Sequence, residues 1–337
     1  MSQVDVVIPC YNYGRFLAEC VASVLAQEGV ALRVLVIDDS SSDLTPEVCA
    51  ELAARDCRIE VRRHSVNRGH IATYNEGLDW AQGDYTLLLS ADDILIAGAL
   101  KRAARVMDSH PQVALTYGRE MIFRSGERLP AVPAADGNEL TIMAGRQFLE
   151  LACSLARNIV PTPTALVRTE VQKRIGGYRP ELPHSGDIEM WLRFGAHASV
   201  CALDAWQAYT RLHTANMRLQ YPGARDYRQL KAAFDTFFDE FGSRLGEASA
   251  LRELACRNLG ERILDRAHFA FDTGRPEECR ELLLLAEETW PDLRAGSDWA
   301  RLRWKRRLKP VLPLLRSVRS AARRLGTVGA TQEGVTP

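Results

Sequence analysis

Residues 1–125 alternate short β-branched runs with segments of helical periodicity, and this alternation restricts the fold more than any other feature of the sequence. The apolar runs predict strands at Val4–Pro9, Leu32–Asp39, Ile59–His64, Tyr85–Ser90 and Val113–Tyr117. The spacing between them predicts helices at Phe16–Gln27, Pro46–Ala54, Ile71–Gln82 and Ala97–Ser109. Because the strands are apolar almost throughout, we expect an α/β fold with a mainly parallel sheet and helices on both faces.

Pairs of adjacent acids follow two of these strands, at Asp38-Asp39 and Asp92-Asp93. In parallel α/β sheets, ligands bind at the carboxyl ends of the strands. Two neighbouring carboxylates repel each other unless a cation compensates them, and Mg²⁺ and Mn²⁺ prefer carboxylate oxygens. The pattern therefore predicts a cation site at Asp92 and Asp93, with a helix cap by either acid as the alternative.

Capping and turn chemistry is the alternative for the polar residues around the first acid pair. Ser40–Asp43 is typical of a turn in which Ser and Asp side chains bond to the nearby backbone. Thr45, Pro46 and Glu47 then form a typical helix start, with Thr45 as the predicted cap.

The second half of the chain predicts a continuation of the same domain and then a change to helices. A helix at Asp187–His197 and a strand near Ala198–Thr210 precede an almost wholly helical part, which includes a hairpin of Leu251–Phe271 and Glu277–Thr289. We expect a domain at 1–220, a helical region at 221–296, a basic amphipathic segment at 297–325 and a disordered tail at 326–337.

Charge is distributed unevenly along the chain. Basic and acidic residues both number 43, but residues 299–324 hold ten basic residues and no acidic one. Apolar and basic side chains separate to opposite faces of a predicted helix here, the apolar ones being Leu314, Val318, Ala321 and Leu325, and the basic ones Arg316, Arg319 and Arg323. This pattern predicts contact with an anionic membrane surface. Docking on the acidic body, or nonspecific attraction to nucleic acid, is the alternative, and no specific nucleic-acid partner is expected.

Cysteine usage and hydropathy indicate the compartment. The eight cysteines form no CxxC pair and lie in apolar segments, which is typical of reduced core thiols. The chain shows no charged-then-apolar leader and no apolar run of about 18 residues. We therefore expect a cytoplasmic protein, and the basic segment adds the expectation of contact with the inner face of the membrane.

Four motifs between Val4 and Met217 together resemble the family 2 glycosyltransferases, which have the glycosyltransferase-A (GT-A) fold. The motifs are VVIPCYN at 6–12, VIDDSSSD at 36–43, LSADD at 89–93 and HSGDIEMWLRF at 184–194. Two further segments, NRGHIATYNEGL at 67–78 and TRLHTANM at 210–217, are similar to segments of the same family. Ser90 departs from the family pattern, which usually has an aspartate at this position.

The resemblance implies an inverting enzyme that moves a sugar from a nucleoside-diphosphate sugar to an acceptor hydroxyl. The acceptor would be a cell-surface polysaccharide, a lipid-linked glycan or a similar glycoconjugate. The implied donor-binding residues are Pro9, Tyr11, Asn12, Asp39, Asn67, Gly69, Asn75 and Asp92. Tyr11 would lie against the base, and Asp39 would contact the base and ribose.

The resemblance also implies the residues that carry the chemistry. Asp93, Asp92 and His213 would hold Mn²⁺ or Mg²⁺ on the diphosphate. Asp187 would act as the catalytic base, with pairing to the helix dipole as the alternative for an acid at a helix start. Glu189 and Trp191 would lie on the acceptor side, with a core position as the alternative for Trp191.

Other function classes are weighed against this one. A sugar nucleotidyltransferase would share the sheet and the acids, but it should open with a Gly-rich, basic loop that PCYNYGRF lacks. A dehydrogenase would need G-x-G-x-x-G after the first strand, which the chain lacks. A non-catalytic nucleotide-sugar-binding or partner-binding protein is the remaining alternative, because Ser90 replaces a common acid.

Overall fold

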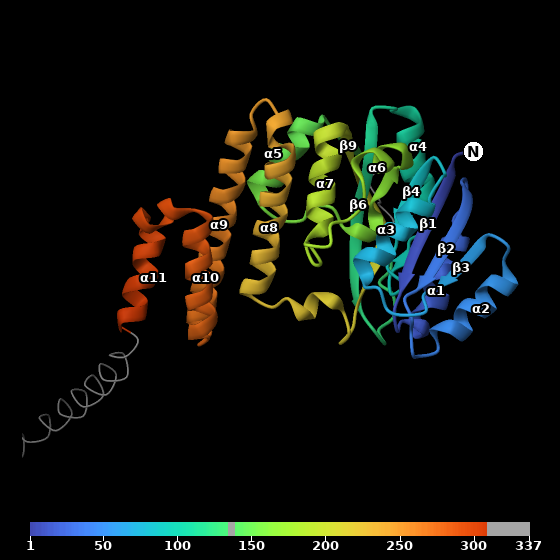
Figure 1. Cartoon of the computed structure of the whole chain (residues 1–337), viewed down its shortest axis with the longest axis horizontal. Helices are drawn as coiled ribbons and strands as arrows, with labels where there is room; N and C mark the ends of the chain where they lie inside the picture. The colour runs from blue at the N-terminus through green and yellow to red at the C-terminus, as the bar shows by residue number, and fades with distance from the viewer. Residues whose placement is uncertain (134–138, 309–337) are drawn as a thin grey trace, which may run out of the picture. The chain divides into compact units, whose positions relative to one another are not determined.

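The computed structural model describes residues 1–133 and 139–308 of the chain (Figure 1). The first apolar runs form four parallel strands in the order β3-β2-β1-β4. Their bounds are β1 Gln3–Cys10, β2 Ala31–Asp38, β3 Ile59–Arg63 and β4 Tyr85–Leu88. Strand β4 ends before the predicted Ser90, so Leu89 and Ser90 lead out of the strand into the acid pair.

The predicted helices connect these strands. Their bounds are α1 Gly14–Leu25, α2 Thr45–Arg55, α3 His70–Trp80 and α4 Ala99–Ser109. The predicted Thr45 cap is wrong, because the Thr45 side chain makes no capping bond. Instead, Asp43 accepts hydrogen bonds from the Thr45 N–H (3.0 Å) and the Gly14 N–H (3.1 Å), so one carboxylate serves the starts of α2 and α1.

Beyond β4 the sheet becomes mixed. The further strands are β5 Ile94–Leu95, β6 Val113–Arg124, β7 Leu140–Met143, β8 Leu166–Arg168 and β9 Ser199–Leu212. The full order is β3-β2-β1-β4-β8-β6-β9-β5, with β7 also on β9. Strand β8 runs antiparallel to both β4 and β6, so the predicted parallel arrangement holds for the first four strands and for β6 with β9. Strands as short as β5, β7 and β8 carry too little alternation to be recognised from sequence.

Helices cover both faces of the sheet, as predicted. Alternate residues of β1 point to opposite sides: Val6 and Ile8 pack in one core cluster, and Val7 in another. The first cluster also contains residues of α1 and α4, and the second contains residues of α3, α6 Thr169–Ile175 and α7 Gly186–His197. The period of two along each strand thus assigns the side chains to two cores.

The first compact unit extends to Leu259, beyond the predicted boundary at residue 220. It includes α5 Gly145–Leu155 and α8 Ala224–Phe241, and α8 lies beside α7 in Figure 1. Short 3₁₀ turns connect these elements at η1 Thr162–Thr164, η2 Met217–Gln220 and η3 Gly242–Arg244. The boundary differs from the prediction because the buried face of α8, which includes Phe234 and Phe237, belongs to this unit.

The second unit comprises Gly260–Pro337 and is helical where it is described. It contains the second half of α9 Ala248–Asp272, and then α10 Pro276–Thr289, η4 Pro291–Ala295 and α11 Ser297–Leu308. The predicted hairpin is present, and Gly274 provides the left-handed turn between α9 and α10 (φ +78°). The predicted stripe from Leu314 to Leu325 and the tail at 326–337 lie outside the described residues.

Six of the eight cysteines are buried, Cys256 is half-buried, Cys57 is exposed, and all eight are free thiols. Within the described residues, no helix combines the length and apolarity that crossing a bilayer requires.

Candidate functional site

A cavity of about 590 Å³ lies at the carboxyl ends of the parallel strands. It brings together eight of the residues predicted from sequence: Pro9, Tyr11, Asn12, Asp39, Asn67, Gly69, Asp92 and Asp93. Five others, Asn75, His213, Asp187, Glu189 and Trp191, are not among its lining residues. Tyr11 is 49% exposed, so its ring is available for contact with a ligand.

Asp39 is a buried carboxylate whose orientation is fixed by the loop that follows β3. Its Oδ1 accepts hydrogen bonds from the Arg68 N–H (2.7 Å) and lies 2.7 Å from His64 Nδ1, and its Oδ2 accepts from the Gly69 N–H (2.9 Å). Gly69 has φ +83°, a left-handed conformation that a side chain would strain. Asn67 donates its amide to the Asp39 carbonyl (3.1 Å). Asp39 thus faces the cavity in a fixed orientation.

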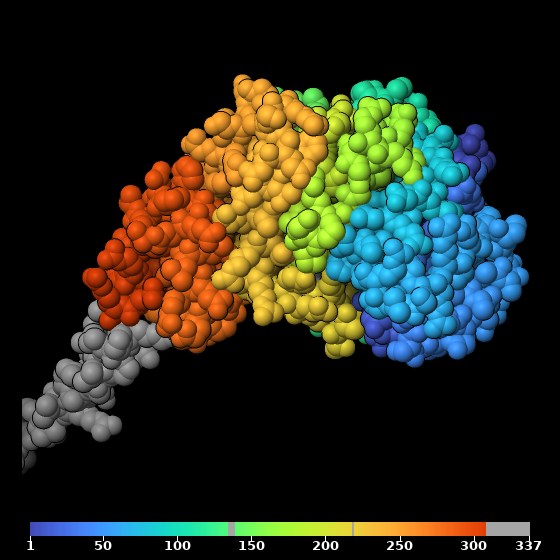
Figure 2. Space-filling view, viewed as in Figure 1, coloured from blue at the N-terminus to red at the C-terminus, as the bar shows by residue number. Residues whose placement is uncertain are grey.

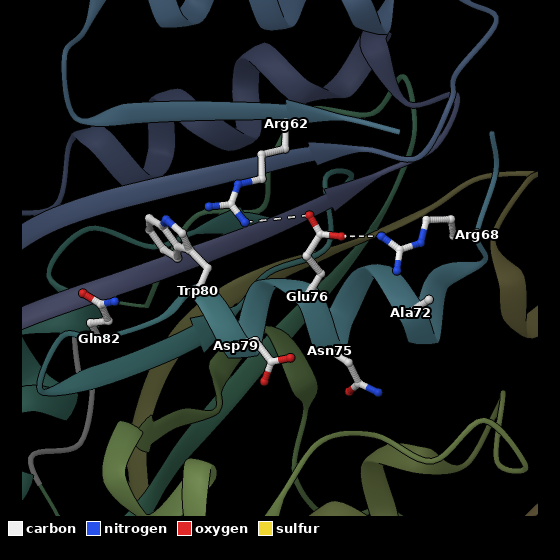
Figure 3. A pocket seen from close by; sticks show the side chains of 8 residues that line it. All are labelled: Arg62, Arg68, Ala72, Asn75, Glu76, Asp79, Trp80 and Gln82. Carbon is white, nitrogen blue, oxygen red and sulfur yellow. Dashed lines mark hydrogen bonds and ion pairs between the residues drawn. The ribbon is translucent and has the colours of Figure 1, made fainter. Parts of the chain in front are cut away.

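Behind Asp39, a second polar network continues to the surface (Figure 3). His64 Nε2 lies 3.0 Å from Glu76 Oε2, so the imidazole stands between two carboxylates. Arg68 donates to the same Glu76 oxygen (2.7 Å), and Arg62 lies on the other side of Glu76 at 3.8 Å. Figure 3 shows Glu76 between these two arginines in an open hollow along α3. The network positions Asp39 from outside the cavity.

Asn12 and the Ser40–Asp43 turn hold each other. Asn12 has φ +58°, and its Oδ1 accepts a hydrogen bond from the Ser42 N–H (2.9 Å), while its own N–H donates to Ser41 Oγ (2.8 Å). Asp38 Oδ1 accepts from the Ser41 N–H (2.8 Å). The polar residues after Asp39 therefore have the turn role that the sequence offered as the alternative.

Asp92 is buried and only partly satisfied by its neighbours. Its Oδ2 accepts a hydrogen bond from Asn216 Nδ2 (3.1 Å) and lies 2.9 Å from His213 Nε2. Its Oδ1 is buried and has no hydrogen-bond partner in the described part of the chain. A buried charged oxygen without a partner is costly, so this atom is suited to a ligand of opposite charge. His213 pairs with the acid and does not itself face the cavity.

Asp93 is the neighbouring acid, and it too lines the cavity. Its Oδ1 accepts a hydrogen bond from the Arg211 N–H (3.1 Å). Burial, and next the charge of Asp92, raise the pKa of Asp93 well above its ordinary value. A cation at this corner would relieve both causes, and the unpartnered Asp92 Oδ1 gives it a ligand atom.

The acid pair does not form a closed metal site by itself. Among the described residues, no group of three or more His, Cys, Asp or Glu side chains is arranged to hold a metal ion. Mg²⁺ is commonly bound by one or two carboxylates together with waters and substrate phosphates. The residues present fit a cation that a phosphate ligand completes.

Asp187 lies in the first turn of α7, outside the cavity lining. Thr162 Oγ1 donates a hydrogen bond to its Oδ2 (2.7 Å). Burial raises the pKa of Asp187 above its ordinary value, and hydrogen bonds from Thr162 and Tyr178 oppose this rise. Tyr74 lines the cavity, and after burial the charges of Asp187 and Asp92 are the next causes that raise its pKa. Tyr74 is therefore within electrostatic range of both acids.

Glu189 and Trp191, which were predicted on the acceptor side, have buried positions outside the cavity lining. Glu189 is fully buried, and its two oxygens pair with Arg179 Nε (2.9 Å) and Arg193 Nη2 (2.8 Å). Trp191 packs in the core cluster below the sheet with Phe194. Both side chains point inward because most of α7 is surrounded by other elements, so even its polar residues are buried.

The Asn75 side chain, for which a donor contact was predicted, bonds to the backbone of Tyr178. Its Oδ1 accepts a hydrogen bond from the Tyr178 N–H (2.6 Å), and its Nδ2 donates to the Tyr178 carbonyl (2.8 Å). A Cβ at Gly177 would lie 2.3 Å from Asn75 Oδ1, so a side chain at this position would displace the Asn75 amide. In Figure 2 the yellow-green residues before α7 lie against light-blue α3, in agreement with the bond from His70 Nε2 to the Pro183 carbonyl (2.8 Å).

Several cavity residues were not predicted. Arg211 and Asn216 lie in the TRLHTANM segment, where only the histidine was singled out. Arg211 is buried, and its Nε donates to the Asp92 carbonyl (3.0 Å). Tyr221 also lines the cavity, and its ring stacks on His184 with centroids 4.2 Å apart. No sequence signal pointed to Tyr221, because it lies after the last recognised motif.

Comparisons with known proteins agree with this geometry. The sequence profile described as Glycosyl transferase family 2 matches residues 5–158. Glycosyltransferase GlyG of Streptococcus pneumoniae serotype 4 is 36% identical over 93 residues, which span 27% of this chain and 31% of that relative. The matched part therefore covers about a third of that relative's length.

Two solved structures have a similar fold. S. aureus TarS 1-349 in complex with UDP-GlcNAc has a TM-score of 0.64 at 19% identity, covering 86% of this chain and 82% of that one. Mannosyltransferase PcManGT from Pyrobaculum calidifontis, in complex with GDP-Man and Mn²⁺, has a TM-score of 0.56 at 19% identity, covering 91% and 81%. At this identity the likeness concerns the fold, and it confirms the GT-A fold predicted from the sequence.

Proposed function

We propose that this chain is a member of glycosyl transferase family 2, whose profile matches residues 5–158, and that it transfers a sugar from a nucleoside-diphosphate sugar to an acceptor hydroxyl with inversion at the anomeric carbon. One observation carries the proposal. The cavity at the strand ends joins a fixed buried carboxylate, Asp39, to an acid pair in which Asp92 Oδ1 has no partner in the described chain. A nucleoside needs an acceptor for its hydroxyl or base N–H groups, and a diphosphate needs positive charge.

Different residues of the cavity would bind different parts of the donor, beginning with the nucleoside. Asp39 accepts hydrogen bonds from the nucleoside, and the half-exposed Tyr11 ring packs against the base. Pro9, Asn12, Asn67 and Gly69 shape the wall around them. Asp39 is effective in this role because three protein contacts fix its carboxylate before a ligand arrives.

Asp92 and Asp93 would hold Mn²⁺ or Mg²⁺ against the diphosphate, with His213 and Asn216 keeping Asp92 oriented. When bound, such an ion stabilises the negative charge that develops on the leaving diphosphate. The Mn²⁺ named with the GDP-Man complex of PcManGT supports this assignment. Ser90 supplies no carboxylate, so both acids that follow it are needed.

Asp187 is proposed to be the general base. Its carboxylate accepts the proton of the acceptor hydroxyl, and the acceptor oxygen bonds to the anomeric carbon. The bond from that carbon to the diphosphate oxygen breaks, and the nucleoside diphosphate leaves with the electron pair. A pKa raised by burial brings this carboxylate nearer to neutral pH, where a general base is effective.

The acceptor is proposed to be a glycan or lipid-linked glycan of a cell-surface polysaccharide or similar glycoconjugate, met at the cytoplasmic face of the membrane. The basic segment at 297–325 would lie on the anionic surface. Its described part, α11, has three basic residues in its last turn, Lys305, Arg306 and Arg307.

Turnover of a panel of nucleotide sugars, measured as release of nucleoside diphosphate with and without Mn²⁺, tests the proposal. The expected result is metal-dependent release from at least one donor, increased by a suitable acceptor. Donor binding without release would instead favour a non-catalytic nucleotide-sugar-binding protein. Release of pyrophosphate from a nucleoside triphosphate and a sugar phosphate would favour a nucleotidyltransferase.

A further inference from the structure

The unit Gly260–Pro337 contains a second hollow of about 570 Å³, formed by α10, η4 and α11. Four arginines line it, Arg280, Arg294, Arg303 and Arg306, together with one acid, Glu287. The proposed transfer reaction does not use this hollow, and no motif of the sequence pointed to it.

Two of the four arginines lack a counterion. Arg294 pairs with Glu287, and Arg280 pairs with Glu277 at 3.1 Å. Arg303 and Arg306 are exposed, and within the described residues neither has an ion-pair or hydrogen-bond partner. They lie three residues apart on α11, so their side chains are neighbours on one face of the helix. The planar fork of a guanidinium group matches the oxygens of a phosphate.

The same hollow has an apolar wall and rim. Leu283 and Trp299 are buried in its wall, whereas Leu284 is 64% exposed. Trp304, next to Arg303 in α11, is 65% exposed. Cationic groups beside exposed Leu and Trp side chains are typical of protein surfaces that meet the boundary between lipid headgroups and acyl chains.

This combination favours a lipid phosphate over a nucleic-acid phosphate. Single-stranded nucleic acid is held largely by bases that stack on open aromatic rings. Trp299, the aromatic residue among the lining residues, is only 7% exposed, and the exposed Trp304 lies outside that lining, so the hollow itself offers no open ring for stacking. The exposed side chain at the rim is the aliphatic Leu284, which fits the upper part of an acyl chain.

We propose that this hollow binds the phosphate headgroup of an anionic phospholipid, with Arg303 and Arg306 on the phosphate and Leu284 at the acyl boundary. The site gives the proposed peripheral location a defined contact, and to that extent it rests on the proposed function. It predicts binding by a specific pair of arginines, beyond the attraction of a basic segment as a whole.

The full chain is titrated with vesicles of phosphatidylcholine in which about a third of the lipid is phosphatidylglycerol, and with vesicles of phosphatidylcholine alone. Binding to the anionic vesicles and not to the neutral ones is expected. The double variant R303Q/R306Q should weaken the vesicle affinity about 25-fold, which is roughly fivefold per arginine. The variant R303K/R306K keeps the positive charge but loses the planar guanidinium groups. Its vesicle affinity should lie between that of the unchanged chain and that of R303Q/R306Q.

A matched control is R301Q/R307Q, which removes the same charge from the same helix outside the hollow. Arg301 pairs with Asp298 at 3.1 Å. Neither Arg301 nor Arg307 lines the hollow. For both reasons this control should lose less affinity than R303Q/R306Q. Equal losses in the two double variants would overturn the site and leave only diffuse attraction by the basic segment.

Two competitors identify the source of the phosphate. Soluble glycerol phosphate and a single-stranded oligonucleotide are added to the vesicle assay. Weak competition by glycerol phosphate is expected, and oligonucleotide binding that R303Q/R306Q abolishes would overturn the lipid assignment. Nucleoside diphosphate release in solution should be unchanged in all of these variants. Vesicle binding therefore tests the phosphate site, and nucleoside diphosphate release tests the transferase proposal independently.

Discussion

Two groups of buried carboxylates in the first unit differ in whether the protein itself satisfies them. At the strand ends, Asp92 Oδ1 is buried without a partner in the described chain, and Asp93 has a pKa raised by burial and by its neighbour. In α7, Glu189 is just as buried, but two arginines neutralise both of its oxygens. A carboxylate that the protein leaves unsatisfied is suited to a ligand, and one that it pairs fully has a structural role.

Asp187 is an intermediate case between these two groups. It lies two residues before Glu189 on the same helix, yet its hydrogen-bond partners are the neutral hydroxyls of Thr162 and Tyr178. Hydroxyl groups hold a carboxylate without neutralising it, so Asp187 can still accept a proton. Asp187 and Glu189 thus differ within one helical turn, because hydroxyl groups hold the first and arginines neutralise the second.

Asp187→Asn should reduce kcat by a factor of roughly 10²–10⁴, because the acceptor hydroxyl loses its proton acceptor. Donor affinity should change by less than about threefold, since Asp187 does not line the donor cavity. Steady-state kinetics and calorimetry on the same preparation separate the two effects. An Asn variant with full activity would remove Asp187 from the mechanism.

Glu189→Gln should reduce the free energy of unfolding by about 3 kcal/mol, because it leaves the buried Arg193 without its countercharge. Urea unfolding measures this loss. The control is Glu150→Gln, which breaks the exposed pair with Arg146 (2.9 Å) and should cost less than about 1 kcal/mol. Equal costs in the two variants would mean that the Glu189 pairs contribute no more than a surface pair.

Asp93→Ala should abolish the effect of Mn²⁺ on donor binding, with a loss of affinity on the order of a hundredfold when the metal is present. Calorimetry with the donor, with and without Mn²⁺, measures both values. The Glu189→Gln protein, in its folded state, serves as the comparison and should keep the metal dependence. Persistent metal dependence in Asp93→Ala would place the cation elsewhere.

Glu76→Gln should raise the KM for the donor by about tenfold, because it weakens the charged contacts that hold His64 and Arg68 around Asp39. The effect on kcat should be small, since Glu76 does not touch the donor cavity. Asp79→Asn, on the same helix and at the same hollow, is the control and should leave KM unchanged. If both variants behave alike, the contacts through His64 have no positioning role.

The smallest effect concerns pH. The folded-state pKa of Asp187 is raised, so the folded protein binds a proton more tightly than the unfolded chain does. The unfolding free energy should therefore fall as the pH rises from the ordinary Asp pKa of about 3.9 through the raised value, and stay level above it. In Asp187→Asn this component of the fall should be absent, which urea titrations at several pH values can measure. An identical pH dependence in both proteins would contradict the raised pKa.

The sequence predicted the parallel half of the fold, and eight of the site residues that it proposed line one cavity. Both are encoded locally: a nearly continuous apolar strand leads into the side chains that line the cavity, as at Pro9 and Asp39. The short β7 and β8 were missed, because three or four residues carry no clear period and their pairing depends on distant strands.

The observed positions of Glu189 and Asn75 have a common cause that the sequence does not show. Whether Glu189 faces a ligand or the core depends on Arg179 and Arg193, and whether Asn75 faces the donor depends on a turn 103 residues away at Tyr178. Motif spacing gives the residue types but not the tertiary partners. The same limit applies to His213, whose imidazole turned out to support Asp92.

The residues that orient the acid pair set a condition for building chimaeras from related proteins. Arg211, His213 and Asn216 orient Asp92 and Asp93, but they lie beyond residue 158, where the family profile ends. A graft that kept residues 5–158 of this chain and took everything after them from another parent would pair its acids with foreign partners. Exchanges designed to change acceptor preference should therefore carry residues 211–216 along with the N-terminal parent.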